Sequence, residues 1–281
     1  MSQGEPFSRV DGIFVPRVAP PDRSEEFDFD QLARMQDEHF WYRGRHRFIL
    51  SVLRAELARS GRQAGLRAID MGGGCGGWLR YLQAHAGGAF AELALGDSSL
   101  RALTLAGPVV GSFASRYQID LLDLAWQAEW DVVFLLDVLE HIPDHEAVLA
   151  QVRKSLRPGG LIFVTTPALR FFWTYNDEVS GHQRRYSRQD FRDLAGLTGL
   201  ELVRADYFMF FLSPLLLLQR LLSRPKASAT PEERQEHVDQ SHRTPAAPIN
   251  EALAGIFSLE ARLAGKVRFP WGTSILAVLR R

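Results

Sequence analysis

The sequence predicts an α/β fold, a doubly wound and mostly parallel sheet with helices on both faces. From Leu66 onward, short apolar segments that read as strands alternate with segments of helical periodicity. This alternation is typical of a parallel sheet, because each parallel strand needs a crossover connection that a helix supplies. With 281 residues, the chain is long enough to bury one large core. Ligands of such sheets bind at the carboxyl ends of the strands, so we expect the functional residues there.

Seven segments are candidates for strands, since each is short and apolar. In chain order they are residues 66–71, 92–96, 116–119, 131–136, 160–165, 200–208 and 274–279. Helical periodicity is clearest in four of the segments between them, at residues 78–86, 100–106, 145–156 and 188–198.

The remaining segments suggest how the chain is organised. Residues 1–29 are rich in Pro, Asp, Glu and Ser and read as a flexible arm, and residues 30–65 read as helices. One domain is expected at 66–281, with a helical lid or insertion at about 209–270 that contains a polar linker, residues 224–248. The apolar run at 207–222 is shorter than the roughly 20 residues that span a bilayer, and it contains Pro214 and Arg220.

The composition excludes several classes of function. The formal net charge is +0, which argues against a nucleic-acid partner. A single cysteine, Cys75, excludes an intramolecular disulfide. The N-terminus lacks the basic start and apolar core of a signal peptide, so we expect a cytoplasmic protein, with contact to a membrane surface as an alternative.

The stretch AIDMGGGCGGW, residues 68–78, fits two nucleotide-binding patterns. Gly72, Gly74 and Gly77 satisfy G-x-G-x-x-G, and Asp97 follows 20 residues later, as in nicotinamide and flavin sites. The same stretch also reads D-x-G-x-G-x-G from Asp70. A carboxylate there suits the ammonium group of an amino-acid moiety, whereas a pyrophosphate gains nothing from it. The glycines alone leave both classes of cofactor open.

Acidic residues at the later strand ends favour one of these classes. Asp97 closes the second strand candidate, Asp120 the third and Asp137 the fourth. The first can accept hydrogen bonds from a ribose diol and the second from an adenine amine. With Asp70 they make a crevice that is hostile to two phosphates and that suits S-adenosylmethionine. The alternative, a nicotinamide-dependent oxidoreductase of the short-chain type, would also need a Tyr-x-x-x-Lys pair, which the chain lacks.

Several motifs in the same order resemble the class I S-adenosylmethionine-dependent methyltransferases, in the group that acts on small molecules. They are AIDMGGGCGGW, LGDSS, YQID, DVVFLLDVLEHIPD, SLRPGGLIFVTTP and FPWGTSILAVLRR. The resemblance implies a Rossmann-like seven-stranded sheet with an antiparallel last strand. It also implies S-adenosylmethionine as cofactor and S-adenosylhomocysteine as product. One departure is Gly73, where the family usually has Cys, Ala or Ser, and we expect it only to loosen the loop slightly.

The resemblance also implies which residues bind the cofactor. Asp97 is expected to hold the ribose and Asp120 the adenine amine, while Asp70 and Asp137 face the methionine end. Trp41 is expected to shield the sulfonium, and an arginine beside it, Arg45, to bind the cofactor carboxylate. The full set of expected cofactor contacts is Trp41, Arg45, Asp70, Gly72, Gly73, Gly74, Asp97, Ser98, Asp120, Leu121, Leu136 and Asp137.

Candidate catalytic residues follow the fourth and fifth strands. The loop at 173–186 resembles a Gly-His-x-Arg-Arg-Tyr signature in a subset of these enzymes; His182 is the candidate base, and Tyr175 and Tyr186 are candidate acceptor contacts. Two arginines of this loop either hold an anion or pin the loop. His141 is expected to line the cleft or to bond the local backbone. His141 and His145 lie four residues apart without an evident third ligand, so we expect no metal.

The expected function is methyl transfer to a hydroxyl or carboxyl group of a small or lipid-linked metabolite. The motif Asn/Asp-Pro-Pro-Tyr/Phe of nucleobase methyltransferases is absent at the fourth strand end. The apolar segment 208–222 has three readings: a lid over the acceptor, a membrane-surface helix or a dimer contact. A regulatory protein that binds the cofactor without catalysis is the alternative function, and the sequence assigns no oligomeric state.

Overall fold

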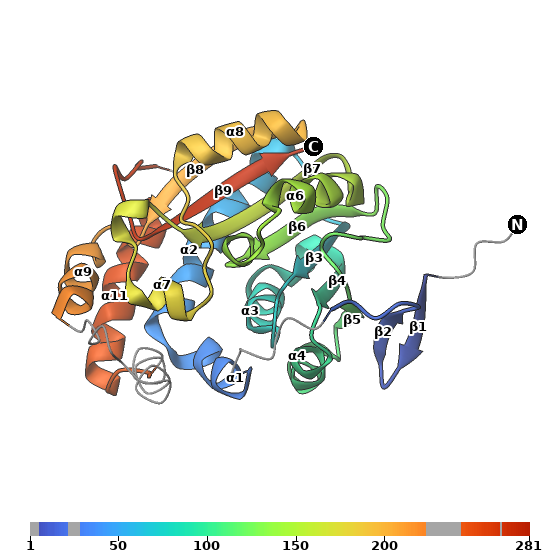
Figure 1. The fold of residues 1–281 in the computed structure, drawn as a ribbon, viewed down its shortest axis with the longest axis horizontal. Coiled ribbons are helices and arrows are strands. Elements are labelled where there is room, and N and C mark those ends of the chain that lie inside the picture. Colours follow the sequence, from blue (N-terminus) through green and yellow to red (C-terminus); the bar gives the residue numbers. More distant parts are fainter. Residues whose placement is uncertain (1–5, 22–28, 223–242, 265) are drawn as a thin grey trace, which may run out of the picture.

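The computed structural model describes residues 6–21, 29–222, 243–264 and 266–281, and a nine-stranded sheet forms its centre (Figure 1). The order of strands is β1-β2-β5-β4-β3-β6-β7-β9-β8. All seven predicted strands are present and adjacent: β3 (Leu66–Met71), β4 (Phe90–Asp97), β5 (Ala114–Gln118), β6 (Trp130–Leu136), β7 (Leu156–Pro167), β8 (Glu201–Phe208) and β9 (Ser274–Arg280). Strands β3 to β7 are parallel, and β9 runs antiparallel to both of its neighbours. The predicted fold class is confirmed, with two strands more than expected.

The two additional strands come from the segment expected to be a flexible arm. Strands β1 (Phe7–Val10) and β2 (Ile13–Pro16) form a hairpin, and β2 adds in parallel to β5. Asp11 and Gly12 both have positive φ, at 49° and 76°, which suits a tight two-residue hairpin turn. The Asp-Gly pair was therefore a local signal for this hairpin, and the expectation of an arm was wrong for residues 7–16. Residues 1–5 and 22–28 lie outside the described part of the chain.

Helices cover both faces of the sheet. Their bounds are α1 (Phe29–Glu38), α2 (Phe40–Ser60), α3 (Gly77–Ala86), α4 (Leu100–Leu105), α5 (Gly107–Val110), α6 (His145–Ser155), α7 (Tyr175–Val179), α8 (Arg188–Thr198), α9 (Ser213–Leu222) and α11 (Ala247–Leu263). Alternate residues of β6 enter different cores: Phe134 packs with α2, α3 and α11, and Leu135 packs with α6 and α8. The sheet is therefore buried on both faces, which explains its long apolar strands.

The C-terminal half of the expected insertion packs against α2. A Cβ atom on Gly44 would overlap the ring of Phe257, so α2 and α11 approach as closely as a glycine permits. Asn250 of α11 accepts a hydrogen bond from Phe40 N at 2.9 Å and donates one to Glu38 O at 2.8 Å, which ties α11 to the junction between α1 and α2. Most of the expected polar linker, residues 224–248, lies outside the described residues.

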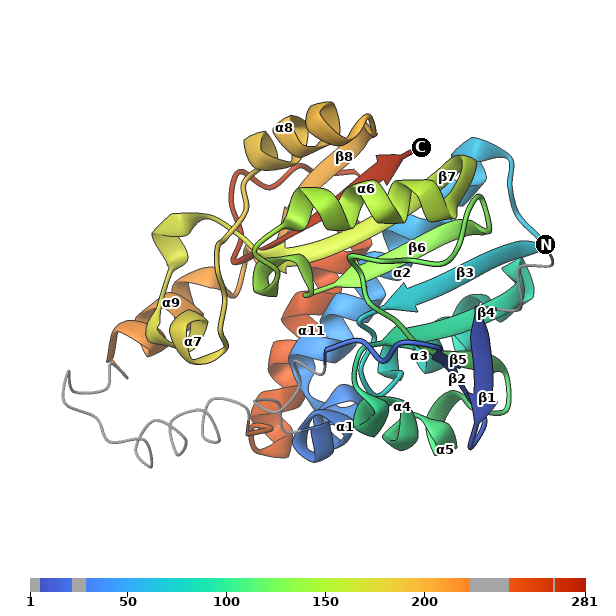
Figure 2. The ribbon, with the colours of Figure 1, turned by 45° about the vertical axis from the view of Figure 1, so that its right-hand side comes forward.

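The carboxyl ends of β3, β6 and β7 point toward the end of the molecule where α7 and α9 lie (Figures 1 and 2). Two connections leave the sheet in opposite directions here, because β3 leads to β4 while the neighbouring β6 leads to β7. Ligands of open α/β sheets bind at such a switch point. None of the helices in the described part of the chain is both long and apolar enough to cross a membrane.

Candidate active site

The glycine-rich loop after β3 is held by hydrogen bonds to the end of β4. The amide of Gly72 donates to Gly96 O at 2.7 Å, and the amide of Gly74 donates to Asp97 Oδ2 at 2.9 Å. Gly72 has φ 76° and its Cβ would lie 2.6 Å from Val138, so only glycine fits this position. The loop leads into α3, which begins at Gly77.

Helix α1 covers the glycine-rich loop. Gln36 Oε1 accepts a hydrogen bond from Gly77 N at 2.9 Å, and a Cβ on Gly74 would lie 3.2 Å from Leu32. The sequence predicted helices over the cofactor at residues 30–65 but named no residue of α1 as a cofactor contact. Leu32 and Gln36 lie four residues apart, so both are on one face of α1.

Asp70 lies beneath the loop and lacks a full set of partners. Its side chain is 1% exposed, and Oδ1 has no hydrogen-bond partner. Burial raises the pKa of Asp70 to about 7, while Arg45 opposes the shift and Asp97 adds to it. A Cβ on Gly73 would overlap Asp70 Oδ2 and Leu95 Cδ1, so a side chain at position 73 would require both side chains to shift. Asp70 and Leu95 therefore limit the space at position 73, and the expectation that Gly73 loosens the loop stays a prediction.

Asp97 is the last residue of β4, and Asp120 follows the neighbouring strand β5 by two residues, so both lie at strand ends, as predicted. Asp97 is 9% exposed and accepts a hydrogen bond from Ser99 N as well as from Gly74 N, so it also organises the loop. Ile119 N donates to Asp97 O at 2.9 Å, and Gln118 Nε2 donates to Ser98 O at 3.0 Å, which join the two strand ends. The Oδ1 atom of Asp120 accepts from Leu122 N, as in a side-chain-stabilised turn.

A groove of about 200 Å³ lies beside Asp120, between residues 118–125 and the segment that follows β2. Residues 16–21 form one of its walls, so the hairpin missed at the sequence level borders the predicted adenine end. Leu121 is half-buried next to Asp120 and packs against the core beneath α6 and α8.

Arg45 of α2 reaches the carboxyl end of β6. It forms an ion pair with Asp137, and its guanidinium lies over the rings of Trp41 and Tyr42, at 4.6 and 5.0 Å from their centroids. Asp137 has a φ of 58°, which is uncommon for a residue other than glycine, and follows the buried Leu136. The Nε atom of Arg45 is buried without a hydrogen-bond partner. Burial raises the pKa of the neighbouring Tyr42 to about 12, so this phenol stays protonated at neutral pH.

These groups fit the amino-acid part of the predicted cofactor. The buried acceptor Asp70 Oδ1 and the buried donor Arg45 Nε both lack partners, and the two side chains interact electrostatically. An amino acid offers an ammonium to the first and a carboxylate to the second. Unpartnered buried polar atoms are costly, so their presence as a complementary pair indicates a ligand that satisfies both.

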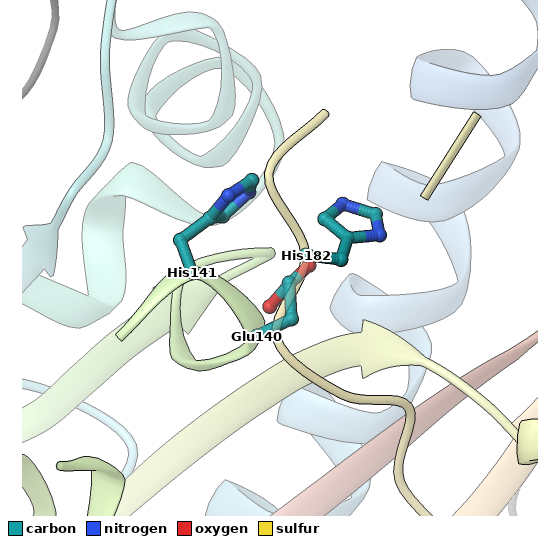
Figure 3. A group of neighbouring side chains, drawn as sticks. All are labelled: Glu140, His141 and His182. Carbon is teal, nitrogen blue, oxygen red and sulfur yellow. The ribbon is translucent and has the colours of Figure 1, made fainter. Parts of the chain in front are cut away.

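Shortly after Asp137 in the chain, Glu140 and His141 meet a third side chain, that of His182, which lies 42 and 41 residues further along the sequence. Glu140 and His141 belong to the turn after β6, and His182 to the loop before α8 (Figure 3). The ring centroids of His141 and His182 are 4.9 Å apart. Burial, reinforced by His182, lowers the pKa of His141 to about 4, and burial together with Asp137 raises the pKa of Glu140 well above its usual value.

His182 is oriented by a buried carboxylate. Its Nδ1 is 2.9 Å from Asp177 Oδ1, and Asp177 also accepts two hydrogen bonds from Arg185, at 2.8 and 3.0 Å. These partners hold the pKa of Asp177 well below its usual value despite burial. The sequence named His182 but missed Asp177, which lies five residues earlier. Tyr175, the third candidate, is the first residue of α7, and its role stays a prediction.

The two arginines of this loop pin it in place. Arg185 bonds Asp177, and Arg184 donates to Ile142 O and Pro143 O at 3.1 and 2.8 Å. Tyr186 is 1% exposed and donates to Leu139 O, so the expectation that it contacts the acceptor is wrong. His145, which the sequence paired with His141, instead bonds the Tyr186 hydroxyl at 2.8 Å.

Comparison with known proteins relates this arrangement to a family. The sequence profile of the family described as "Methyltransferase domain" matches residues 40–205, more than half of the chain. Two proteins named "Ubiquinone biosynthesis O-methyltransferase" are among the similar sequences. The one from Marinobacter nauticus is 36% identical over 107 residues, 37% of this chain and 44% of that protein. The one from Pseudomonas syringae pv. tomato is 30% identical over 149 residues, 52% and 63% of the two chains. The chain thus spans about half the length of the curated relatives it matches.

Solved structures share the fold at low identity. An S-adenosylmethionine-dependent methyltransferase from Mesorhizobium loti superimposes with a TM-score of 0.50 at 15% identity, over 78% of this chain and 93% of that chain. The cyclase SpnF superimposes with a TM-score of 0.50 at 14% identity, over 83% and 80%. Likeness at this level concerns the fold alone, since the two neighbours differ in their described chemistry.

Proposed function

This chain belongs to the class I S-adenosylmethionine-dependent methyltransferases, and from this premise we propose that it transfers a methyl group to a hydroxyl group of a small or lipid-linked metabolite. The observation that carries the proposal is the pair of complementary buried atoms, Asp70 Oδ1 and Arg45 Nε, beside the glycine-rich loop. Family membership leaves the oxidoreductase alternative without support.

The chain's own residues provide binding, alignment and exclusion of water. Asp70 and Arg45 would hold the amino-acid part of the cofactor, Asp97 the ribose and Asp120 the adenine amine. Leu136 and the ring of Trp41 would border the reacting centre, and the backbone of Gly72–Gly74 would approach the methionine part. When bound, S-adenosylmethionine supplies an electrophilic methyl group on a sulfonium. Alignment by the surrounding residues can then contribute several kcal/mol to lowering the barrier.

An acceptor with a hydroxyl group is supported by the Asp177–His182 pair. A carboxyl acceptor is already ionised at neutral pH and needs no help, whereas a hydroxyl keeps its proton. A neutral imidazole fixed by a carboxylate can accept that proton, and it can equally bind a cation that acidifies the hydroxyl. The names of the curated relatives, which are O-methyltransferases, also favour oxygen as the acceptor atom.

Contact with a membrane surface is proposed for the end of the molecule around α9. Phe211, Leu215 and Leu218 are 45%, 52% and 54% exposed, and Trp271 is also exposed. Leu215 and Leu218 lie on α9, which is too short to span a bilayer, and exposed apolar side chains on such a helix are typical of interfacial contact. α9 lies at the same end of the molecule as α7, so a lipid-linked acceptor could reach the site from this surface (Figures 1 and 2).

The proposal is tested first by calorimetric titration with S-adenosylmethionine and S-adenosylhomocysteine. We expect wild type to bind both and Asp97→Ala and Asp70→Asn to bind at least tenfold more weakly, with Asp193→Asn, an exposed change on α8, as the control. Because Asp70 has a pKa of about 7, wild-type affinity should rise from pH 6 to pH 8, and Asp70→Asn should lose this rise. Failure of wild type to bind either ligand would refute the proposal.

Methyl transfer is then measured with cofactor that carries a labelled methyl group. A phenol with an alkyl tail should accept the label, and a fatty acid should not. In His182→Ala the rate of transfer to the phenol should fall at least 100-fold without loss of cofactor binding. A variant that kept the wild-type rate would remove His182 from the reaction.

A further inference from the structure

We infer that Glu140, His141 and His182 bind a divalent transition-metal ion. One carboxylate oxygen of Glu140 and one ring nitrogen of each histidine all lie within 4.8 Å of one another (Figure 3). Ligand atoms that share one zinc-sized ion, each about 2 Å from it, are roughly 3–4 Å apart. Small rotations of the side chains would therefore bring this group onto a single ion.

The buried carboxylate of Glu140 is the strongest support for a bound cation. Its side chain is 0% exposed, and neither carboxylate oxygen has a hydrogen-bond partner outside Glu140 itself. A buried carboxyl group without partners is strongly unfavourable, and buried carboxylates in proteins are paired or coordinate metals. A cation held between Glu140 and the two histidines would satisfy this group.

Hydrogen bonds already hold the His182 ring and the backbone around the proposed ligands in place. Asp177 fixes the His182 ring through Nδ1, as carboxylates do behind metal-binding histidines, so the other nitrogen is the one available to an ion. The backbones that carry the ligands are joined, because Gln183 N donates to Glu140 O at 2.7 Å. Arg184 adds two hydrogen bonds to the carbonyls of Ile142 and Pro143. The approach of the two segments is thus built into the fold.

Two imidazoles and one carboxylate suit zinc, iron(II), cobalt or manganese better than calcium or magnesium, which prefer oxygen ligands. Three protein ligands leave coordination positions open, which is typical of catalytic rather than structural sites. The side chain of His182 is 16% exposed, so solvent reaches at least one of the proposed ligands.

The role of the ion rests on the proposed function. An acceptor hydroxyl that binds at an open position becomes more acidic, as water does on zinc. The hydroxyl gives its proton to water, and its oxygen forms a bond to the methyl carbon. The carbon–sulfur bond of the cofactor breaks, and its electron pair stays on the sulfur, which becomes a neutral thioether.

Metal binding is tested without reference to activity. Tag-free protein is freed of metal with a chelator and titrated with cobalt(II), followed by visible absorption and by calorimetry with zinc(II). We expect one ion per chain, and an affinity at least tenfold lower in His182→Ala and in Glu140→Gln. His85→Gln, a change at an exposed histidine on α3, is the matched control and should bind as wild type does.

The outcomes separate this inference from the proposed function. Each variant is also titrated with S-adenosylhomocysteine, and unchanged binding there shows that the variant is folded. If wild type binds the cofactor product but no cobalt, or if the variants bind cobalt as wild type does, the metal site is refuted and the methyltransferase proposal stands. If cobalt binds at this site but the cofactor does not, the proposed function fails instead. Should Glu140→Gln not fold, His182→Ala, at a half-buried position, decides the matter.

Discussion

At the scale of the residue, Gly73 is matched to the carboxylate beneath it. A side chain at position 73 would overlap Asp70 Oδ2 and Leu95, although the resemblance in sequence implies a small side chain there. We predict that Gly73→Ala displaces the Asp70 carboxylate and weakens S-adenosylhomocysteine binding at least tenfold, while the fold is retained. Calorimetric titration of the variant measures this change.

The control is the same substitution where space is open. Gly88→Ala adds a Cβ with no atom within 4 Å and should bind as wild type does. If Gly73→Ala also binds as wild type does, the loop can move enough to accept a side chain at position 73. The prediction from the contacts of Gly73 would then be wrong.

At the scale of the element, α9 carries the prediction of membrane contact. We predict that wild type floats with vesicles of phosphatidylethanolamine and phosphatidylglycerol in a density gradient. The double variant Leu215→Ser/Leu218→Ser should float several-fold less, because it removes apolar area that would enter the interface. The bound fraction is read from the gradient.

Leu197→Ser provides the comparison, since Leu197 is 67% exposed on α8, a different helix. It should float as wild type does. Equal flotation of all three proteins would show that α9 makes no specific contact with the vesicles. If wild type is absent from the vesicle fraction, membrane contact is refuted, and α9 is then either a lid over the acceptor or a dimer contact.

At the scale of the whole molecule, buried carboxyl groups make stability depend on pH. Glu260 of α11 is 0% exposed and accepts a hydrogen bond from Phe210 N at 2.7 Å, and burial raises its pKa from 4.5 to about 7. The folded protein therefore holds this proton more tightly than the unfolded chain. Compared with a neutral side chain, Glu260 does not lower the free energy of unfolding below pH 4.5, where it is protonated in both states. Between pH 4.5 and about pH 7 it lowers the free energy of unfolding increasingly, by up to about 3 kcal/mol.

We predict that the stability of Glu260→Gln relative to wild type rises between pH 5.5 and pH 8. Denaturant unfolding at several pH values measures the difference. Asp70 and Glu140 also have raised pKa values, so wild type itself should lose stability over this range, and the comparison with the variant isolates Glu260. Glu251→Gln changes an exposed residue of the same helix and should follow wild type. Parallel curves for Glu260→Gln and wild type would contradict the assignment.

The order of strands and helices was determined by the sequence itself. The ends of β3, β8 and β9 fall within one or two residues of the prediction, because apolar periodicity and turn residues act over a few neighbours. The acidic residues at four strand ends were likewise readable, since the carboxyl ends of adjacent parallel strands must share one edge of the sheet. The hairpin at 7–16 was missed because its strands have four residues each and β2 pairs with β5, in which the partner of Ile13 is Arg116, 103 residues later.

Only the tertiary structure decided which side chains meet. In the sequence, His141 and His145 were considered together because they are four residues apart. In the fold, His182 instead lies beside Glu140 and His141, and His145 bonds the hydroxyl of Tyr186. Likewise, the unpartnered atoms of Asp70 and Arg45 become visible only once β3 and α2 are packed. Helices and strands can be predicted from the sequence because they depend on residues that are close in the chain. The chemistry of a buried group depends on neighbours that are distant in the chain, and only the packed tertiary structure brings these together.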